Sequence, residues 1–192
     1  MKKNLPKIIV IFMCYILIPT FGHTDCPEYT FIKIADTATS VPGGNGGFFE
    51  GLSLSNPAVS GSRVAFRGEG GDVEGVFIGD GNSLIPVVVS DDPISGGSTI
   101  DIIYDDFAFG GGAINVIALA SNGLRGIYSD SANSLIKIVE FGDSAPTGGT
   151  FSTIFFVSRQ GQNLAFQANI TGGQASNGVF TRIAGVTELV AD

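Results

Sequence analysis

The sequence contains no tryptophan, one histidine and two cysteines among 192 residues. Because His23 is the only imidazole, a Ser-His-Asp triad has one possible base and a multi-histidine metal site is excluded. Cys14 lies within an apolar N-terminal run, and only Cys26 would remain after that run is removed. The mature chain is therefore expected to lack an intrachain disulfide and to depend on packing for its stability.

Basic residues are also scarce, with 10 Lys and Arg against 18 Asp and Glu. Phosphate backbones are bound by clustered Lys and Arg, so this composition predicts no nucleic-acid partner. The basic residues beyond the N-terminal run are scattered singly: Lys33, Arg63, Arg67, Arg125, Lys137, Arg159 and Arg182.

The N-terminus has the pattern of a secretory signal peptide. Lys2, Lys3 and Lys7 precede the uncharged run 8–18, which is shorter than the ~20 apolar residues of a membrane-spanning helix. We expect residues 1–24 to be a signal peptide and residues 25–32 an N-terminal segment; a retained membrane anchor is the alternative. Removal of 1–24 takes three of the ten basic residues and none of the 18 acidic ones, which leaves a net charge of −11. The mature protein is expected outside the membrane, in the extracellular space, at the cell surface or in the periplasm.

Glycine is abundant, with 28 residues, and it marks an internal repeat of about fifty residues. The motif Ala65-Phe66 recurs as Ala165-Phe166, with Ile117-Ala118-Leu119 as the expected counterpart in between. These landmarks predict three units, residues 33–89, 90–139 and 140–192. Three further landmarks keep the same period: the diglycines Gly43-Gly44, Gly96-Gly97 and Gly148-Gly149; the triplets beginning at Gly75, Gly126 and Gly178; and the acidic residues Asp36, Asp91 and Asp143.

Each unit contains short β-branched and aromatic runs bounded by Gly, Asn, Ser and Asp, which is typical of strands. In the third unit we expect strands at 151–157, 164–170, 178–182 and 187–191, and in the first unit a hairpin turn at Asp80-Gly81-Asn82. The predicted fold is all-β, with three four-stranded antiparallel repeat units stacked as an incomplete β-propeller-like arc. A three-fold β-prism is the alternative.

The landmarks resemble those of secreted bacterial tandem-repeat proteins described by an Asn-x-x-Gly-x-x-Ala-Phe repeat. The first unit carries Val41-Pro42-Gly43-Gly44 and Val64-Ala65-Phe66, and the third carries Gly148-Gly149 and Leu164-Ala165-Phe166. The resemblance covers residues 33–192 and implies export and a β-repeat architecture. It supplies no activity, because no established chemistry belongs to that family. The name-giving Asn is absent from the first and third units.

Acidic residues gather in the second unit, where oxygen ligands on loops could hold Ca²⁺. The spacing of a known calcium loop is missing, so the competing interpretation is that these are solvated loop carboxylates and turn formers. The repeated Asp36, Asp91 and Asp143 are expected to cap turns, and no cofactor is expected. The candidate calcium ligands are Asp91, Asp92, Asp105 and Asp106, with Asp101 beside them.

We expect an exported, non-catalytic binding or structural module of the cell envelope or extracellular space. Its expected partners are a second copy of itself, another cell-surface protein or a glycan. One alternative is a glycan-active hydrolase or lyase on a propeller scaffold, because glycosidases need only two carboxylates across one bond. Another is a truncated gene product without function.

Overall fold

The computed structural model describes residues 30–50, 54–130 and 134–192, and within them the chain is all-β. The expected signal peptide, Cys14, His23 and Cys26 lie outside the described residues. No described residues form a helix long and apolar enough to cross a membrane.

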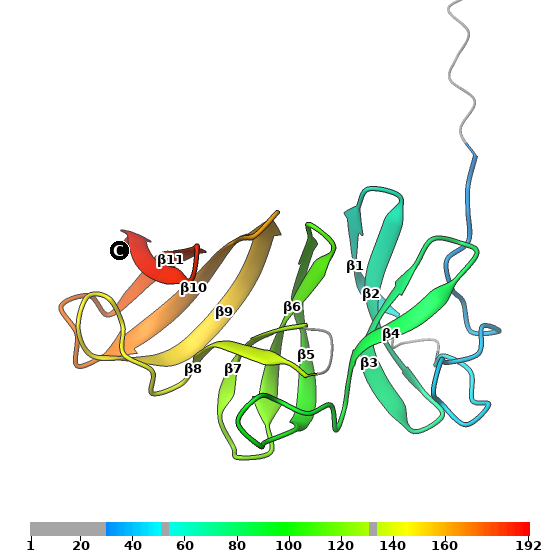
Figure 1. Cartoon of the computed structure of the whole chain (residues 1–192), viewed down its shortest axis with the longest axis horizontal. Helices are drawn as coiled ribbons and strands as arrows, with labels where there is room; N and C mark the ends of the chain where they lie inside the picture. Colours follow the sequence, from blue (N-terminus) through cyan, green and yellow to red (C-terminus); the bar gives the residue numbers. More distant parts are fainter. Residues whose placement is uncertain (1–29, 51–53, 131–133) are drawn as a thin grey trace, which may run out of the picture. The chain divides into compact units, whose positions relative to one another are not determined.

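The strands form three antiparallel sheets, each with its four strands paired in chain order (Figure 1). This confirms the predicted fold class. Sheet 1 comprises β1 (Ser55–Ser60), β2 (Arg63–Gly70), β3 (Val73–Gly79) and β4 (Leu84–Val89). Sheet 2 comprises β5 (Ile100–Gly110), β6 (Ala113–Ala120), β7 (Arg125–Ser129) and β8 (Ile136–Glu140). Sheet 3 comprises β9 (Thr150–Gln160), β10 (Asn163–Thr171), β11 (Asn177–Ile183) and β12 (Val186–Ala191).

Local sequence explains the turns between these strands. The turn that joins the first two strands of each sheet has a glycine at its centre, at Gly61, Gly111 and Gly161, with φ of +63°, +59° and +59°. Such positive φ values favour glycine because they crowd a Cβ atom. The predicted turn at Asp80-Gly81-Asn82 is also present, and the Asp80 carboxylate accepts hydrogen bonds from two backbone N–H groups that lower its pKa.

The sheets pack through opposite faces, which we name by their order in the chain. The proximal face is the one turned toward the preceding part of the chain, and the distal face is the opposite one. In sheet 1 the proximal face carries Phe66 and Phe77, and the distal face carries Ala65 and Val76. The distal face of sheet 1 shares a hydrophobic cluster with the proximal face of sheet 2, and the distal face of sheet 2 shares another with the proximal face of sheet 3. A β-prism would need sheets 1 and 3 to share a core, and no hydrophobic cluster among the described residues contains both.

An aromatic triad marks the proximal faces of sheets 1 and 3. In sheet 1, Phe49 meets Phe77 edge to face, with centroids 5.0 Å apart and an interplanar angle of 87°. In sheet 3, Phe151 meets Phe180 at 5.0 Å and 85°. Such edge-to-face contacts place the positive ring edge against the negative ring face. The repeat is therefore preserved at the level of ring packing as well as sequence.

The second unit corrects one expected correspondence. The third strand of each sheet begins or nearly begins with an equivalent glycine, at Gly75, Gly126 and Gly178. The residues of the second strands that pair with these glycines are therefore equivalent to one another: Gly68, Ala118 and Ala168. The counterpart of Ala65-Phe66 is therefore Asn115-Val116, so the expected match with Ala118-Leu119 is wrong by three residues. Ile117-Ala118-Leu119 resembles the motif in composition, but it follows Asn115-Val116 in β6.

Candidate functional site

The diglycines close the same turn in front of each sheet. The N–H groups of Gly44, Gly97 and Gly148 donate to the carbonyl groups of Val41, Ile94 and Ala145, over 3.0, 3.1 and 3.0 Å. The turn therefore uses the second glycine of the pair in the first two units and the first glycine in the third. Gly43 and Gly96 lie within this turn and Gly149 directly follows it; all three have a positive φ, where a side chain would be strained. We assign the diglycines a structural role.

The repeated acidic position also proves to be structural, but in a different register from the predicted one. Asp92 Oδ2 accepts from the Val89 N–H (2.8 Å), and Asp143 Oδ2 accepts from the Glu140 N–H (2.9 Å). In the first unit Thr39 Oγ1 accepts the equivalent hydrogen bond, from the Asp36 N–H over 3.0 Å. The equivalent residues are thus Thr39, Asp92 and Asp143, and the predicted series through Asp36 and Asp91 is wrong at its first two members.

Asp36 and Asp91 have other surroundings. Asp36 forms an ion pair with Lys33 over 2.9 Å and accepts hydrogen bonds from Thr39 Oγ1 and the Ala38 N–H. These interactions, led by the bond from Lys33, lower the pKa of Asp36 to about 2. Asp91 is exposed and adopts a φ of +68°, a conformation that Asp tolerates better than most residues. Each of the two residues therefore belongs to a local turn.

The structure separates the predicted calcium ligands into two places. Asp91 and Asp92 lie in the loop after β4, whereas Asp105 and Asp106 lie within β5. Burial raises the pKa of Asp92, and its Oδ2 already accepts the Val89 N–H. Among the described residues, no group of three or more His, Cys, Asp or Glu side chains is arranged to hold a metal ion.

Asp105 takes part in a contact that joins sheet 1 to sheet 2. Arg67 Nη1 lies 3.2 Å from Asp105 Oδ1, and Arg67 Nε donates to the Ile103 carbonyl over 3.2 Å. Asn56 Nδ2 donates to the Asp105 carbonyl over 2.7 Å. Arg67 also pairs with Glu74 on its own sheet over 2.5 Å, so one guanidinium connects carboxylates of two sheets.

A second arginine joins sheet 2 to sheet 3. Arg159 Nη1 donates to Oδ1 of the buried Asn115 over 2.5 Å, and Arg159 Nε donates to the Gly161 carbonyl over 2.8 Å. The arginine thus satisfies an amide that burial would otherwise leave unpaired, which costs free energy. Sequence reasoning missed both arginines, because nothing in the local pattern of Arg67 or Arg159 indicates which strand lies opposite.

A hydrogen-bonded group in sheet 2 surrounds the buried residues Tyr128 and Glu140. Tyr128 Oη donates to Glu140 Oε1 over 2.8 Å, and Lys137 Nζ lies 3.5 Å from Glu140 Oε2 and 3.0 Å from Asp143 Oδ1. Burial and the neighbouring Glu140 raise the pKa of Tyr128, and the bond to Asp143 raises that of Lys137. Both groups therefore stay protonated at neutral pH.

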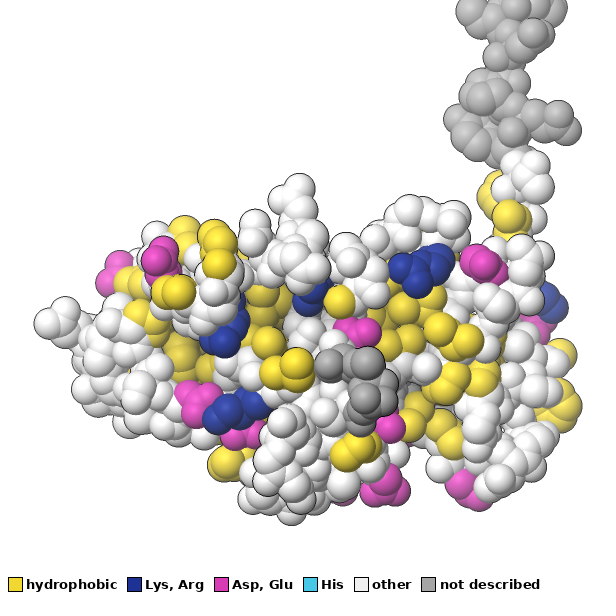
Figure 2. Space-filling model, viewed as in Figure 1, with side chains coloured by type: hydrophobic (Ala, Val, Ile, Leu, Met, Phe, Trp, Pro, Cys, Tyr) yellow, Lys and Arg dark blue, Asp and Glu magenta, His cyan; other side chains and the backbone are white. Residues whose placement is uncertain are grey.

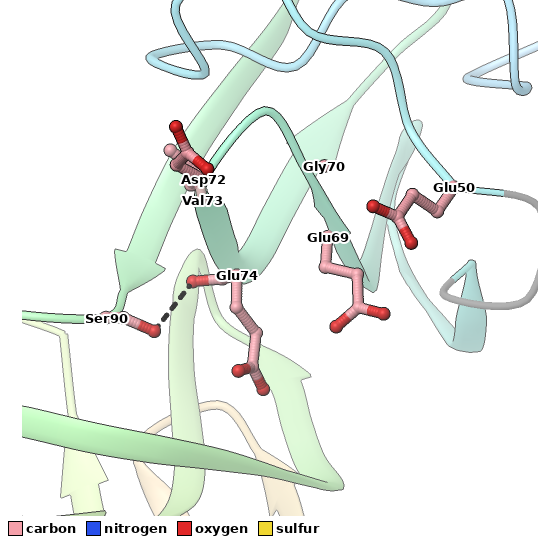
Figure 3. A pocket seen from close by; sticks show the side chains of 7 residues that line it. All are labelled: Glu50, Glu69, Gly70, Asp72, Val73, Glu74 and Ser90. Atoms are coloured by element: carbon pink, nitrogen blue, oxygen red, sulfur yellow. Dashed lines mark hydrogen bonds between the residues drawn. The ribbon is translucent and has the colours of Figure 1, made fainter.

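Four acidic residues line an open hollow of ≈ 380 Å³ beside sheet 1 (Figure 3). In Figure 3 the Asp72 side chain points away from the carboxylates of Glu69 and Glu74, and Ser90 Oγ donates to the Glu74 carbonyl. Glu74 is already paired with Arg67. The acidic side chains of the hollow therefore do not all turn toward one point. The hollow is lined by Glu50, Glu69, Gly70, Asp72, Val73, Glu74 and Ser90.

No family model, curated protein or solved structure matches this chain.

Proposed function

We propose that this chain is an exported, non-catalytic β-repeat module that binds a glycan or another protein of the cell envelope or extracellular space. Its three sheets form a framework from which turns and loops project, and loops on a rigid framework are a common place for binding residues. Export rests on the signal-peptide pattern of residues 1–24.

One observation carries the non-catalytic part of this proposal: two of the candidate carboxylates, those of Asp92 and Asp105, serve the framework. Asp105 pairs with Arg67 across two sheets, and Asp92 and Asp143 fix the turns that lead into sheets 2 and 3. A general acid or base must instead face the bond that reacts. A carboxylate held by a structural arginine or a backbone N–H is poorly placed for that task.

The surface charge supports a glycan or protein partner over nucleic acid. On the face shown in Figure 2, Lys and Arg side chains form separate patches among Asp and Glu and do not merge into one basic surface. The net charge of −8 for the whole chain has the same sign as a phosphate backbone. Electrostatic repulsion would therefore oppose nucleic-acid binding.

A panel of purified bacterial and host polysaccharides tests this function. The full chain is run through gels that contain each polysaccharide, and the same mixtures are assayed for new reducing ends and for the ultraviolet absorbance of unsaturated lyase products. Retardation in at least one gel without product formation supports the proposal. Product formation overturns it in favour of a glycan-active hydrolase or lyase. If no polysaccharide retards the chain, a protein partner is the remaining form of the proposal, and cross-linking on intact cells tests it; no cross-linked partner there overturns the binding function.

A further inference from the structure

The distal face of sheet 3 is exposed, although the same face of the other two sheets is an interface. Val179 is the counterpart of Val76 and Ile127, because each residue follows the equivalent glycine of the third strand. Val76 and Ile127 are each 0% exposed beneath the next sheet, whereas Val179 is 42% exposed. Val179 thus keeps the apolar character that its position has in the buried contacts of the other two sheets, but no further sheet among the described residues packs over it.

A bulge in the first strand of sheet 3 also indicates an interface on this face. Asn56 and Phe156 stand at the same bulge in β1 and β9, with φ of +49° and +36°. From this bulge the Asn56 side chain reaches Asp105 of the neighbouring sheet. Phe156 is 65% exposed and adopts a φ that is rare for bulky residues. By analogy with Asn56, the bulge directs the Phe156 side chain toward the side of sheet 3 on which a further sheet would pack.

These residues also form a shallow groove, and its charge permits a second copy to approach. Phe156, Ala165, Gln167 and Val179 line a hollow of ≈ 210 Å³ on this face. Within residues 150–192 the two arginines, Arg159 and Arg182, balance Glu188 and Asp192. The excess of negative charge therefore lies in the preceding units, and repulsion between two copies is weakest at sheet 3.

We propose that the distal face of sheet 3 is the interface between two copies of this chain. The second copy offers the same face, because the proximal face of its sheet 1 is already covered by Val41 and Phe49 of the preceding loop. An interface between identical faces has two-fold symmetry and closes as a dimer, whereas a head-to-tail contact would continue into a fibre. The inference does not depend on the ligand of the proposed function.

Light scattering and sedimentation of the purified full chain test this interface at micromolar concentrations. We expect a dimer, and we expect Phe156→Asp to shift it to a monomer because two carboxylates would face each other in an apolar contact. Val179→Asp provides a second variant on β11. Val59→Asp is the matched control, since Val59 is an exposed apolar residue of β1. Circular dichroism and melting curves establish that each variant is folded.

Loss of the dimer in Phe156→Asp, with a dimer retained in Val59→Asp, supports the proposal. Because Phe156 is largely exposed, its substitution should not prevent folding even if Val179→Asp does. A wild-type chain that stays monomeric overturns the proposal. So does a dimer that survives Phe156→Asp, or an open-ended series of larger assemblies.

Discussion

Tyr128 Oη donates a hydrogen bond to Glu140 Oε1 over 2.8 Å inside sheet 2. Their counterparts in sheet 1 are Phe77 and Val89. Glu140 pairs with Gly126 as Val89 pairs with Gly75, and Tyr128 and Phe77 each stand two residues after that glycine. The second unit thus replaces an apolar pair with a polar one. A buried hydroxyl and a buried carboxylate satisfy each other there. If either is removed, the other keeps only a longer contact: Tyr128 Oη with the Leu124 carbonyl over 3.3 Å, or Glu140 Oε2 with Lys137 Nζ over 3.5 Å.

Tyr128→Phe and Glu140→Val should each reduce the free energy of unfolding by about 1–2 kcal/mol, because each breaks the buried bond between the hydroxyl and the carboxylate. The double variant recreates the pair of sheet 1 and should lose clearly less than the sum of the two single losses, by at least about 0.5 kcal/mol. Urea unfolding at neutral pH measures this coupling. Additive losses would show that the two side chains do not depend on each other.

We expect Asp92→Asn and Asp92→Ala to differ in how their stability depends on pH. Burial raises its pKa above the ordinary value of 3.8, so its charged form is disfavoured in the folded state. The resulting loss of stability is absent below pH 3.8, where the carboxyl is neutral in both states, and it grows as pH rises through the folded pKa. Asp92→Asn keeps an oxygen for the Val89 N–H and avoids this loss.

Asp92→Asn should therefore match the wild type at low pH and equal or exceed its stability near neutral pH. Asp92→Ala should lose about 1 kcal/mol at both, because the Val89 N–H loses its acceptor. Thermal melts across the acidic range provide the measurement. An Asn variant that is less stable than the wild type only near neutral pH would mean that the charge itself stabilises the turn.

The three hairpin glycines provide a matched test of sheet packing. A Cβ atom at Gly61 or Gly161 would meet nothing within 4 Å, whereas one at Gly111 would lie 2.7 Å from the Gly161 carbonyl oxygen on the neighbouring sheet. Since the φ values are nearly equal, Ala at each position bears the same backbone cost of about 1–2 kcal/mol. Gly111→Ala should cost an additional 1–3 kcal/mol, roughly, from the clash.

Chemical denaturation of the three Ala variants checks this order. Equal losses at Gly61, Gly111 and Gly161 would show that sheets 2 and 3 do not approach each other closely at this turn. The comparison needs no assumption about the size of the backbone cost, because that cost is common to all three glycines.

Export gives a prediction that is independent of the fold. When the full chain is expressed in a bacterium, we expect the product outside the cytoplasm to begin near His23 or Asp25, as N-terminal sequencing would show. Replacing two residues of the run 8–18 by Asp should keep the chain inside the cell. A full-length N-terminus on the exported product would contradict cleavage and favour the retained anchor.

Strand number, turn chemistry and repeat period could be predicted because they depend on neighbours in the sequence. Alternation in β10 places Leu164, Phe166, Ala168 and Ile170 on one face, and glycine marks the positions of positive φ. Register within the second unit could not be predicted from composition. There Asn115-Val116 replaces the Ala-Phe pair, and hydrogen bonding to β7 shows the correspondence.

The contacts between sheets could not be predicted for a different physical reason. Arg67 and Asp105 are 38 residues apart, and Arg159 and Asn115 are 44 apart. Each pair meets only because one sheet packs on the next, and a scattered arginine carries no local sign of its partner. Asp105, one of the four candidate calcium ligands in the sequence, is therefore a residue of the framework.

The most direct test of this framework role compares Asp105→Asn with Asp106→Asn on the same polysaccharide panel. The account predicts that Asp105→Asn lowers the free energy of unfolding by up to about 1 kcal/mol, as expected for a partly exposed ion pair, and leaves polysaccharide retention unchanged. Asp106→Asn should change neither. If Asp105→Asn instead keeps full stability and abolishes the release of reducing ends, then Asp105 is catalytic and the account is wrong.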